Sequence, residues 1–350
     1  MKYIVIFGLL ASPAIHCKIC SDCKPYTSCP ASFSVVPELD DISPKEFKEK
    51  YCGVEYINGN RIPKVCCSEV TTKNLDTHPN IDLLPTSCGY IDNYPTSSRV
   101  VNLYEFPWIA LLSSSTRKLA CDAIVINKKY VLTTAFCAEK LIPTYVQFGD
   151  YNPKSETDCM PGASNICENF IQNLTIQELI PHPEKVLALP NIKHNIALIR
   201  VNDEIDFTHR NIAPICLPIS EHIRSANKIN KTGIVAGWLL NDTNRREFST
   251  YLKIPAYIDE PQKCIRDLEI KVDSEASFEN AFCGTLSSED KLECNAVNGD
   301  PFMSIDKVNN VNRYVLYGIY SHGLRRCLKN SDIYVDITKH MEWILDNIRP

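Results

Sequence analysis

Cysteine content constrains this chain more than any other property of its sequence. The 350 residues include 17 cysteines, and so many cysteines are typical of proteins that fold in an oxidising, extracellular compartment. The number is odd, so a fully paired set requires that one cysteine be removed. The sequence therefore predicts a secreted protein whose fold is cross-linked by many disulfide bonds.

The first 17 residues have the pattern of a secretory signal peptide. Lys2 precedes a short apolar run at residues 3–10, which is too short to cross a bilayer and is followed by small residues. Cleavage after Cys17 is favoured because it leaves 16 cysteines, an even set, whereas the alternative, cleavage after Ala14, leaves one thiol unpaired. No later apolar run has the length of a membrane helix, so we expect no membrane span.

The net charge and the N-glycosylation acceptor sequences are both consistent with an extracellular protein. The formal net charge of −5 argues against a nucleic-acid-binding protein and against a polybasic protein of membrane surfaces. Acceptor sequences for N-linked glycosylation begin at Asn173, Asn230 and Asn241. We therefore expect a secreted glycoprotein that binds no nucleic acid.

The chain divides into a short cysteine-rich segment and a long remainder. Residues 20–67 contain six cysteines in a segment too short to bury a large apolar core, so disulfides must stabilise it. Six cysteines allow many different pairings, and the sequence alone does not choose among them. Residues 68–98 are rich in Thr, Asn, Asp, Pro and Ser, which indicates a linker.

From residue 99 onward, the sequence predicts an all-β fold. Runs of β-branched and aromatic residues alternate with turn residues, a pattern typical of a β-sandwich or β-barrel. The clearest runs are residues 125–126, 130–132, 145–148, 196–199, 234–236 and 314–320. Only residues 337–348 have the apolar spacing of a helix.

Three motifs resemble those that surround the catalytic residues of the chymotrypsin-like (S1) serine proteases. The nucleophile loop of that family is written C-Q-G-D-S-G-G-P, and residues 294–301 read C-N-A-V-N-G-D-P. The histidine motif L-T-A-A-H-C corresponds to L-T-T-A-F-C at residues 132–137, and the aspartate motif D-I-A-L-I-R to N-I-A-L-I-R at residues 195–200. The resemblance covers roughly residues 99–350 and implies two packed antiparallel β-barrels with a C-terminal helix.

All three catalytic positions of the resemblance carry substitutions. Phe136 occupies the position of the base, Asn195 that of the aspartate and Asn298 that of the nucleophilic serine. A serine needs a base to accept its proton, and the base needs a carboxylate to orient it. Losing one member of such a triad costs on the order of 10⁴- to 10⁶-fold in turnover. The sequence therefore predicts a serine protease homologue without protease activity.

The elements that support catalysis in the family are altered as well. Ala296 replaces a glycine of the oxyanion hole, and Val297 replaces the aspartate that receives the new N-terminal amine after activation. Residues 99–101 resemble the activation site, although Arg99 as an ordinary linker residue is the alternative reading. Because Val297 cannot accept the charge of an amine, we expect that cleavage at Arg99 does not order the site.

The specificity pocket of the family also differs in this chain. Leu292 stands where trypsin-like members carry aspartate, His322 replaces a tryptophan between Ser321 and Gly323, and Asp332 replaces a glycine of the wall. A carboxylate at position 332 would either attract a basic side chain or block the pocket. Ser321 and His322 are consecutive in a strand, so we expect their side chains to point to opposite faces and not to form a catalytic pair.

The cysteine spacing in residues 20–67 is similar to that of the clip domain of arthropod proteases, with another disulfide-rich module as the alternative. We therefore expect a signal peptide at residues 1–17, a clip domain at 20–67, a linker at 68–98 and an inactive S1 domain at 99–350. The resemblance implies the disulfides Cys20–Cys66, Cys23–Cys52, Cys29–Cys67, Cys88–Cys216, Cys121–Cys137, Cys159–Cys167, Cys264–Cys283 and Cys294–Cys327.

The sequence gives no reason to expect a cofactor or a bound metal. His182 and His194 have no other metal-ligating residue at a useful spacing, so we interpret them as surface or packing residues. Asp150 lies near a calcium-loop position of the family, but acidic residues in exposed loops are usually just solvated.

The resemblance implies a function in binding, because the scaffold is kept while the triad is lost. We expect a secreted regulator or cofactor of an extracellular protease cascade, such as arthropod melanisation or Toll-type immune signalling. Its partners would be extracellular proteins, namely clip-domain proteases or their substrates such as prophenoloxidase. Two alternatives remain, an adhesion or matrix protein on the same scaffold and a hydrolase with residual activity.

Overall fold

The structure is a computed structural model, and it divides the chain into two compact units, residues 1–73 and residues 74–350. It describes residues 23–25, 51–57, 60–66, 75–91, 99–114, 121–160, 162–187, 192–240, 248–268, 278, 280–287, 297–323 and 331–350. In the first unit, β1 (Cys23–Pro25), β3 (Asn60–Cys66) and β2 (Tyr51–Ile57) form an antiparallel sheet in that order. The signal peptide, Cys20, Cys29 and Cys67 lie outside the described residues, and only the backbone of Cys23, Cys52 and Cys66 is described, so the three disulfides expected in this unit stay predictions.

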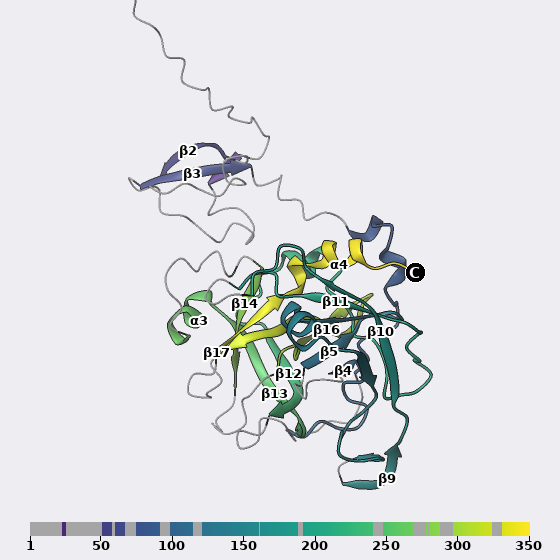
Figure 1. Cartoon of the computed structure of the whole chain (residues 1–350). Helices are drawn as coiled ribbons and strands as arrows, with labels where there is room; N and C mark the ends of the chain where they lie inside the picture. The colour runs from purple at the N-terminus through teal and green to yellow at the C-terminus, as the bar shows by residue number, and fades with distance from the viewer. Residues whose placement is uncertain are drawn as a thin grey trace, which may run out of the picture. The chain divides into compact units, whose positions relative to one another are not determined.

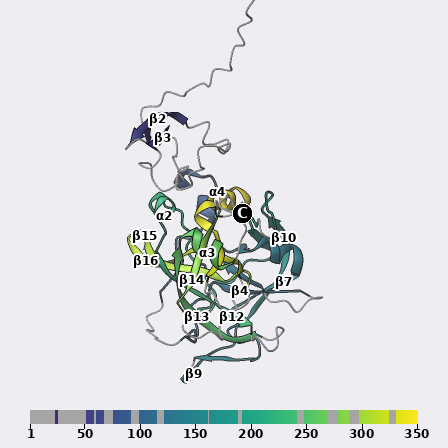
Figure 2. The same ribbon diagram turned by 90° about the vertical axis from the view of Figure 1, so that its left-hand side faces the viewer.

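The larger unit is built on two closed antiparallel barrels (Figures 1 and 2). The first barrel runs β10-β11-β6-β5-β4-β7 and the second runs β12-β13-β14-β17-β16-β15. Their strands are β4 (Ile109–Ser113), β5 (Cys121–Val125), β6 (Tyr130–Thr133), β7 (Tyr145–Phe148), β10 (Gln172–Pro181), β11 (Ala197–Val201), β12 (Thr232–Leu240), β13 (Phe248–Asp259), β14 (Ala281–Leu286), β15 (Pro301–Val308), β16 (Val311–Gly323) and β17 (Ser331–Asp336). A separate hairpin joins β8 (Asp158–Met160) to β9 (Ala163–Glu168). Each run of residues expected to be a strand overlaps one of these, and the expected double barrel is confirmed.

The largest apolar cluster contains residues of both barrels, and a second cluster lies within the second barrel. Trp108, completely buried before β4, packs against Tyr314 of β16 and donates its indole N–H to the sulfur of Met303 on β15, 2.9 Å away. Trp238 of β12 stacks on Tyr251 and is equally buried. Because these large side chains lose most of their contact with water, their burial strongly favours the packed arrangement of the barrels.

The expected C-terminal helix is present but is interrupted. Residues Ile337–Lys339 form a 3-10 turn, η8, and α4 begins only at Met341 and ends at Asn347. Asp336 causes the break, because its side chain accepts the backbone N–H of Thr338 while its carbonyl accepts a bond from the ring of His340. In Figures 1 and 2, the chain ends beside β10, where Arg349 pairs with Glu178.

Two short helices were missed by the sequence analysis, and the prediction of only one helix was wrong. They are α2 (Glu221–Ser225) and α3 (Pro261–Asp267). Helices of five and seven residues contain at most two turns, so an apolar stripe does not repeat often enough to be recognised. Among the described residues, no helix combines the length and the apolarity that crossing a bilayer requires.

Part of the expected linker packs on the larger unit. Within residues 75–91, the short turns η4 (Leu75–Thr77) and η5 (Ile81–Leu83) lie beside the C-terminal helix. Asn80 donates from its amide nitrogen to the carbonyls of Leu345 and Ile348, at 2.9 and 3.0 Å. Leu75 is 1% exposed. These residues therefore belong to the folded core of the larger unit.

Four of the expected disulfides are present in the structure. They are Cys88–Cys216, Cys121–Cys137, Cys159–Cys167 and Cys264–Cys283. Cys294 and Cys327 lie outside the described residues, as does the glycosylation acceptor Asn241. The acceptors Asn173 and Asn230 have exposed side chains, and their glycosylation stays a prediction.

The first testable prediction compares two of these disulfides. Cys88 and Cys216 are separated by 128 residues, whereas Cys159 and Cys167 are separated by 8. The chain-entropy model predicts that replacing the first pair by serine lowers the free energy of unfolding by about 5 kcal/mol and replacing the second by about 3 kcal/mol. Guanidinium unfolding of the two double variants measures the difference, and equal losses would contradict the entropic explanation.

Candidate functional site

The strand register brings two of the three triad positions together. β11 pairs with β6 in antiparallel register, with Ala197 opposite Thr133. The residues just before Ala197 and just after Thr133 therefore meet at one edge of the first barrel. The backbone N–H of Phe136 donates to the side-chain oxygen of Asn195 at 2.9 Å. Asn195 is 2% exposed and Phe136 is 38% exposed.

Asn298, the third position, approaches from the second barrel. Its carbonyl oxygen lies 3.7 Å from the sulfur of Cys137, the residue that follows Phe136. The same carbonyl accepts the backbone N–H of Asp122 at 2.9 Å. The next residue, Gly299, has a φ of 102°, and a Cβ there would lie 2.0 Å from the carbonyl oxygen of Asp122. The loop thus needs glycine at this position to lie so close to β5.

A chain of neutral hydrogen bonds replaces the ionised triad. The amide nitrogen of Asn195 donates to Ser321 Oγ at 2.8 Å, and Ser321 Oγ lies 3.1 Å from His322 Nδ1. Since the serine oxygen already accepts a bond, its proton is free to point toward the imidazole. Burial lowers the pKa of His322 to about 4, so the imidazole is neutral at neutral pH, and either Ser321 Oγ or His322 Nδ1 donates the bond between them. None of the three hydrogen-bonded side chains, Asn195, Ser321 and His322, supplies a negative charge.

The expectation that Ser321 and His322 point to opposite faces was wrong. The register between β16 and β17 shifts between Tyr320 and His322. Such a bulge inserts an extra residue into one strand and redirects its side chains. The alternation of faces fails at this point, and the two consecutive side chains touch. A sequence pattern of period two contains no signal for a bulge.

Two buried acidic residues were missed by the sequence analysis. Asp122 on β5 and Asp300 beside Asn298 are 1% and 0% exposed. Burial, then the charge and a hydrogen bond of Asp300, raise the pKa of Asp122 well above its usual range. Burial also raises the pKa of Asp300 to about 7, although bonds from Asp122 and from the Val297 N–H, at 2.7 Å, oppose that rise. The pair therefore retains at least one proton at neutral pH.

The sequence contained one signal for this pair. Asp300 replaces the second glycine of the family's nucleophile motif, and Val297 replaces its aspartate. Val297 is 3% exposed, and its backbone N–H donates a hydrogen bond to the side chain of Asp300. Compared with the family motif, this loop lacks the carboxyl group at position 297 and carries one three residues later, at Asp300. The carboxyl group of Asp122 interacts with it there.

The activation segment is already paired with the second barrel. The carbonyl of Arg99 accepts the N–H of Lys253 on β13 at 2.8 Å, and the N–H of Val101 donates to the carbonyl of Tyr251 at 3.0 Å. Val101 is completely buried. The residues around Arg99 are therefore already paired with the second barrel while the chain is intact. Cleavage at Arg99 would first have to separate this short pairing.

One residue of the vestigial pocket, Asp332, is buried in the structure. Asp332 is 8% exposed, and burial together with the charge of Asp300 raises its pKa to about 7. A cavity of about 10 Å³ lies between Asn195, Ser321 and His322, and Asp332 does not line it. That volume holds about one water molecule. Leu292 lies outside the described residues, and Gly323 pairs with Asp332 in the sheet.

The conclusion that His182 and His194 lack metal-ligating companions was also wrong. The structure brings His340 to them, and a ring nitrogen of each of the three histidines lies within 4.8 Å of the other two. His194 and His340 are 146 residues apart. No local spacing rule connects residues so distant in the sequence.

Comparison with known proteins finds a matching family, related sequences and a solved structure with the same fold. The family model described as Trypsin matches residues 96–344. Phenoloxidase-activating factor 1 of Holotrichia diomphalia is 28% identical, over 94% of this chain and 91% of its own, and melanization protease 1 of Drosophila melanogaster is 24% identical, over 98% and 94%. The crystal structure of the Drosophila Grass clip serine protease of the Toll pathway shares the fold, with a TM-score of 0.63 at 22% identity and 93% of each chain covered.

The carboxyl pair predicts how stability depends on pH. The pKa of Asp300 in the folded chain, about 7, lies above its ordinary value of 3.8, so its contribution is complete below about pH 4 and is lost as the pH rises through 7. We expect the free energy of unfolding to fall by about 2–4 kcal/mol between pH 5 and pH 8. Asp300→Asn keeps an oxygen for Val297 and mimics the protonated acid, so the variant should lose much of this decline.

Chemical denaturation at several pH values measures the effect. Asp203→Asn, at an exposed position, is the matched control and should leave the pH dependence unchanged. The pKa of Asp332 is also raised to about 7, so this residue contributes part of the loss of stability with rising pH in every variant. A decline of the same size in Asp300→Asn and in the natural chain would show that the pair does not hold a proton.

Proposed function

This chain belongs to the trypsin family, and we propose that it is a secreted, non-catalytic member that regulates an extracellular protease cascade by binding. The observation that carries the proposal is the amide of Asn195. It joins the Phe136 N–H to Ser321 Oγ, where catalysis needs an imidazole and a carboxylate. Neither phenylalanine nor asparagine accepts a proton at neutral pH, so the site has no base for a nucleophile.

The relatives support the choice of a cascade. One is named for activating phenoloxidase, another for melanization, and the solved structure for the Toll pathway. We infer that this chain acts on the same kind of pathway and that its partners are clip-domain proteases or a substrate such as prophenoloxidase. No feature of the described residues favours a matrix or adhesion protein over this reading.

The exposed apolar residues around the former histidine position supply a binding surface. Phe136 and Ile142 flank η6 (Cys137–Leu141), and 38% and 59% of their surfaces are exposed. A phenylalanine ring at the mouth of the vestigial site offers a partner the type of apolar anchor that dominates many interfaces. The position that once held the catalytic base would then contact the partner.

A residual hydrolase is the second candidate, because Ser321 Oγ lies 3.1 Å from His322 Nδ1. The arrangement opposes that role. Ser321 is 4% exposed and its oxygen accepts a bond from Asn195, so it is neither accessible nor free to attack. No carboxylate hydrogen-bonds to His322 among the described residues, and its Nε2 has no partner there.

The catalytic prediction is tested with peptide ester and amide substrates and with a fluorophosphonate probe. We expect no turnover above buffer and no labelled serine. The triple variant Phe136→His, Asn195→Asp, Asn298→Ser should also stay inactive, because Val297 still occupies the position of the ordering aspartate. Turnover that disappears in Ser321→Ala but persists in the exposed control Ser287→Ala would instead establish the hydrolase.

The binding prediction is tested by cross-linking the full-length protein to components of native body fluid, followed by mass spectrometry. We expect clip-domain proteases or prophenoloxidase to be recovered. The Phe136→Ala variant should bind the recovered partner at least tenfold more weakly, a loss of about 1.4 kcal/mol. Ile305→Ala removes an apolar side chain that is 46% exposed on β15 and should have no effect. Recovery of matrix or cell-surface proteins alone would contradict the proposal.

A further inference from the structure

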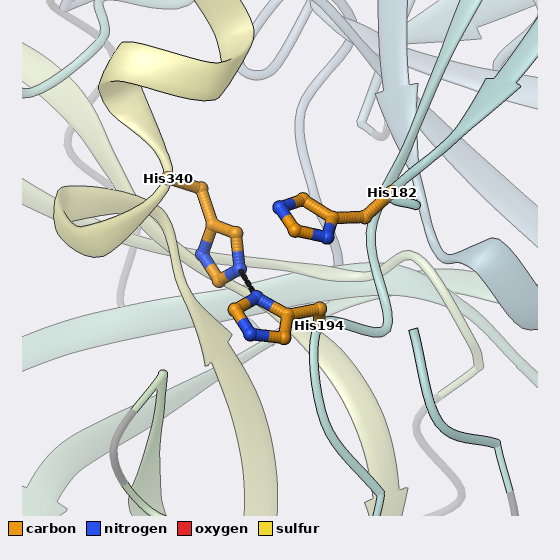
Figure 3. A group of neighbouring side chains, drawn as sticks. All are labelled: His182, His194 and His340. Atoms are coloured by element: carbon orange, nitrogen blue, oxygen red, sulfur yellow. Dashed lines mark hydrogen bonds between the residues drawn. The ribbon is translucent and has the colours of Figure 1, made fainter. Parts of the chain in front are cut away.

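Three histidines from separate parts of the larger unit meet beside α4. His182 follows β10, His194 lies just before β11, and His340 lies between η8 and α4. One ring nitrogen of each lies within 4.8 Å of those of the other two. Figure 3 shows the three rings gathered at one point, with His340 coming from the helical segment. The cluster uses none of the three substituted triad positions.

The contacts within the cluster are close. His194 Nδ1 lies 3.2 Å from His340 Nε2, which Figure 3 marks with a dashed line. The rings of His182 and His194 are stacked, with centroids 4.3 Å apart and planes 6° apart. His182 and His340 are 8% and 1% exposed, whereas the side chain of His194 is 17% exposed. The cluster is therefore buried but reachable from solvent past His194.

The outer contacts orient lone pairs into the cluster. The Nδ1–H of His340 donates to the carbonyl of Asp336, 2.7 Å away, so Nε2 carries a lone pair that faces His194. A backbone carbonyl that fixes the far nitrogen in this way is typical of metal-binding histidines. His194 Nε2 lies 3.7 Å from a carboxylate oxygen of Glu184 and 3.1 Å from the Asn280 amide. Both His340 and His194 thus have partners for the nitrogen that a metal would not use.

Two of the three histidines are uncharged at neutral pH. Burial in the first place, and the proximity of His194 to a smaller extent, lower the pKa of His182 and of His340 to about 4. Metal ions compete with protons for imidazole nitrogen, so a histidine that stays neutral keeps its lone pair available. Three positive charges at these distances would repel one another.

The backbone of His194 is held in an unusual conformation. Its φ is 46°, in the left-handed region that residues other than glycine rarely adopt. Strained residues of this type persist only where the surrounding structure fixes them, and they gather at functional sites. Here the conformation keeps the ring of His194 against His182 and His340.

We propose that His182, His194 and His340 bind one divalent transition-metal ion, with Zn²⁺ as the best match. Imidazole nitrogens suit Zn²⁺ and Cu²⁺, whereas Mg²⁺ and Ca²⁺ take oxygen ligands. Three protein ligands leave the fourth position of a tetrahedral Zn²⁺ site for water.

Binding requires a small rearrangement of the rings. The ion takes the place of the proton between His194 Nδ1 and His340 Nε2, and that proton moves to His194 Nε2, where Glu184 and a turned Asn280 amide accept it. A metal lies in the plane of each ring that binds it, so His182 must rotate out of its stack. Whichever nitrogen it uses, His182 gives up the 3.2 Å bond that its Nδ1 accepts from the Glu184 N–H.

The test uses the full-length protein after removal of metal by a chelator and dialysis. Equilibrium dialysis against Zn²⁺ with elemental analysis should find one ion per chain, and Co²⁺ in its place should give the visible absorption of a four-coordinate site. We expect His194→Gln to weaken Zn²⁺ binding at least tenfold and to abolish the Co²⁺ spectrum. The matched control is His209→Gln, an exposed histidine that stacks on Phe170 and should change neither readout.

Three results would overturn the site. They are the absence of saturable Zn²⁺ binding, an unchanged affinity in His194→Gln, and an equal response to Mg²⁺. Because His340 is completely buried, His340→Gln can fail to fold for reasons unrelated to metal. The partly exposed His194 therefore provides the main variant, and its folding is checked by thermal unfolding in the absence of metal, where its transition should match that of His209→Gln.

Discussion

Two buried carboxyl groups, one from each side of the junction between the barrels, impose the strongest electrostatic constraint on this protein, and burial raises the pKa of both. Asp122 belongs to a strand of the first barrel and Asp300 to the loop that enters the second, and neither is more than 1% exposed. An ionised carboxylate in such a place needs a cation, whereas a protonated one needs only a hydrogen-bond acceptor. Because the pKa of both groups is raised, protons neutralise this pair at least in part at neutral pH.

At the candidate site, neutral side chains occupy the positions where the family carries ionisable ones. The amide of Asn195 makes two hydrogen bonds, one accepted from Phe136 and one donated to Ser321. A carboxylate can only accept, so an amide at this position reverses the direction of the second bond. The hydrogen bonds of the buried Asn195 side chain are thus satisfied without an ion pair.

Motifs and local patterns were enough to predict much of the fold. Residues 132–137 and 195–200 located neighbouring strands, and their antiparallel register places Phe136 beside Asn195. Four disulfide pairs also followed from the resemblance. Long-range and irregular features were not predictable in this way. The bulge beside Ser321 breaks the strand period, the helical segment is interrupted at His340 by bonds to Asp336, and the histidine cluster joins residues far apart in the chain.

The pairing of Arg99–Val101 with β13 bears on whether proteolytic cleavage can control when the protein becomes active. A zymogen becomes active when one proteolytic cut changes its conformation. Its activity therefore depends on the enzyme that makes the cut. In this chain, the segment that such a cut would liberate is already docked, with Val101 completely buried. In the proposed regulatory role, the protein would therefore need no cleavage at Arg99 to reach its folded binding form, and its concentration alone would set its effect.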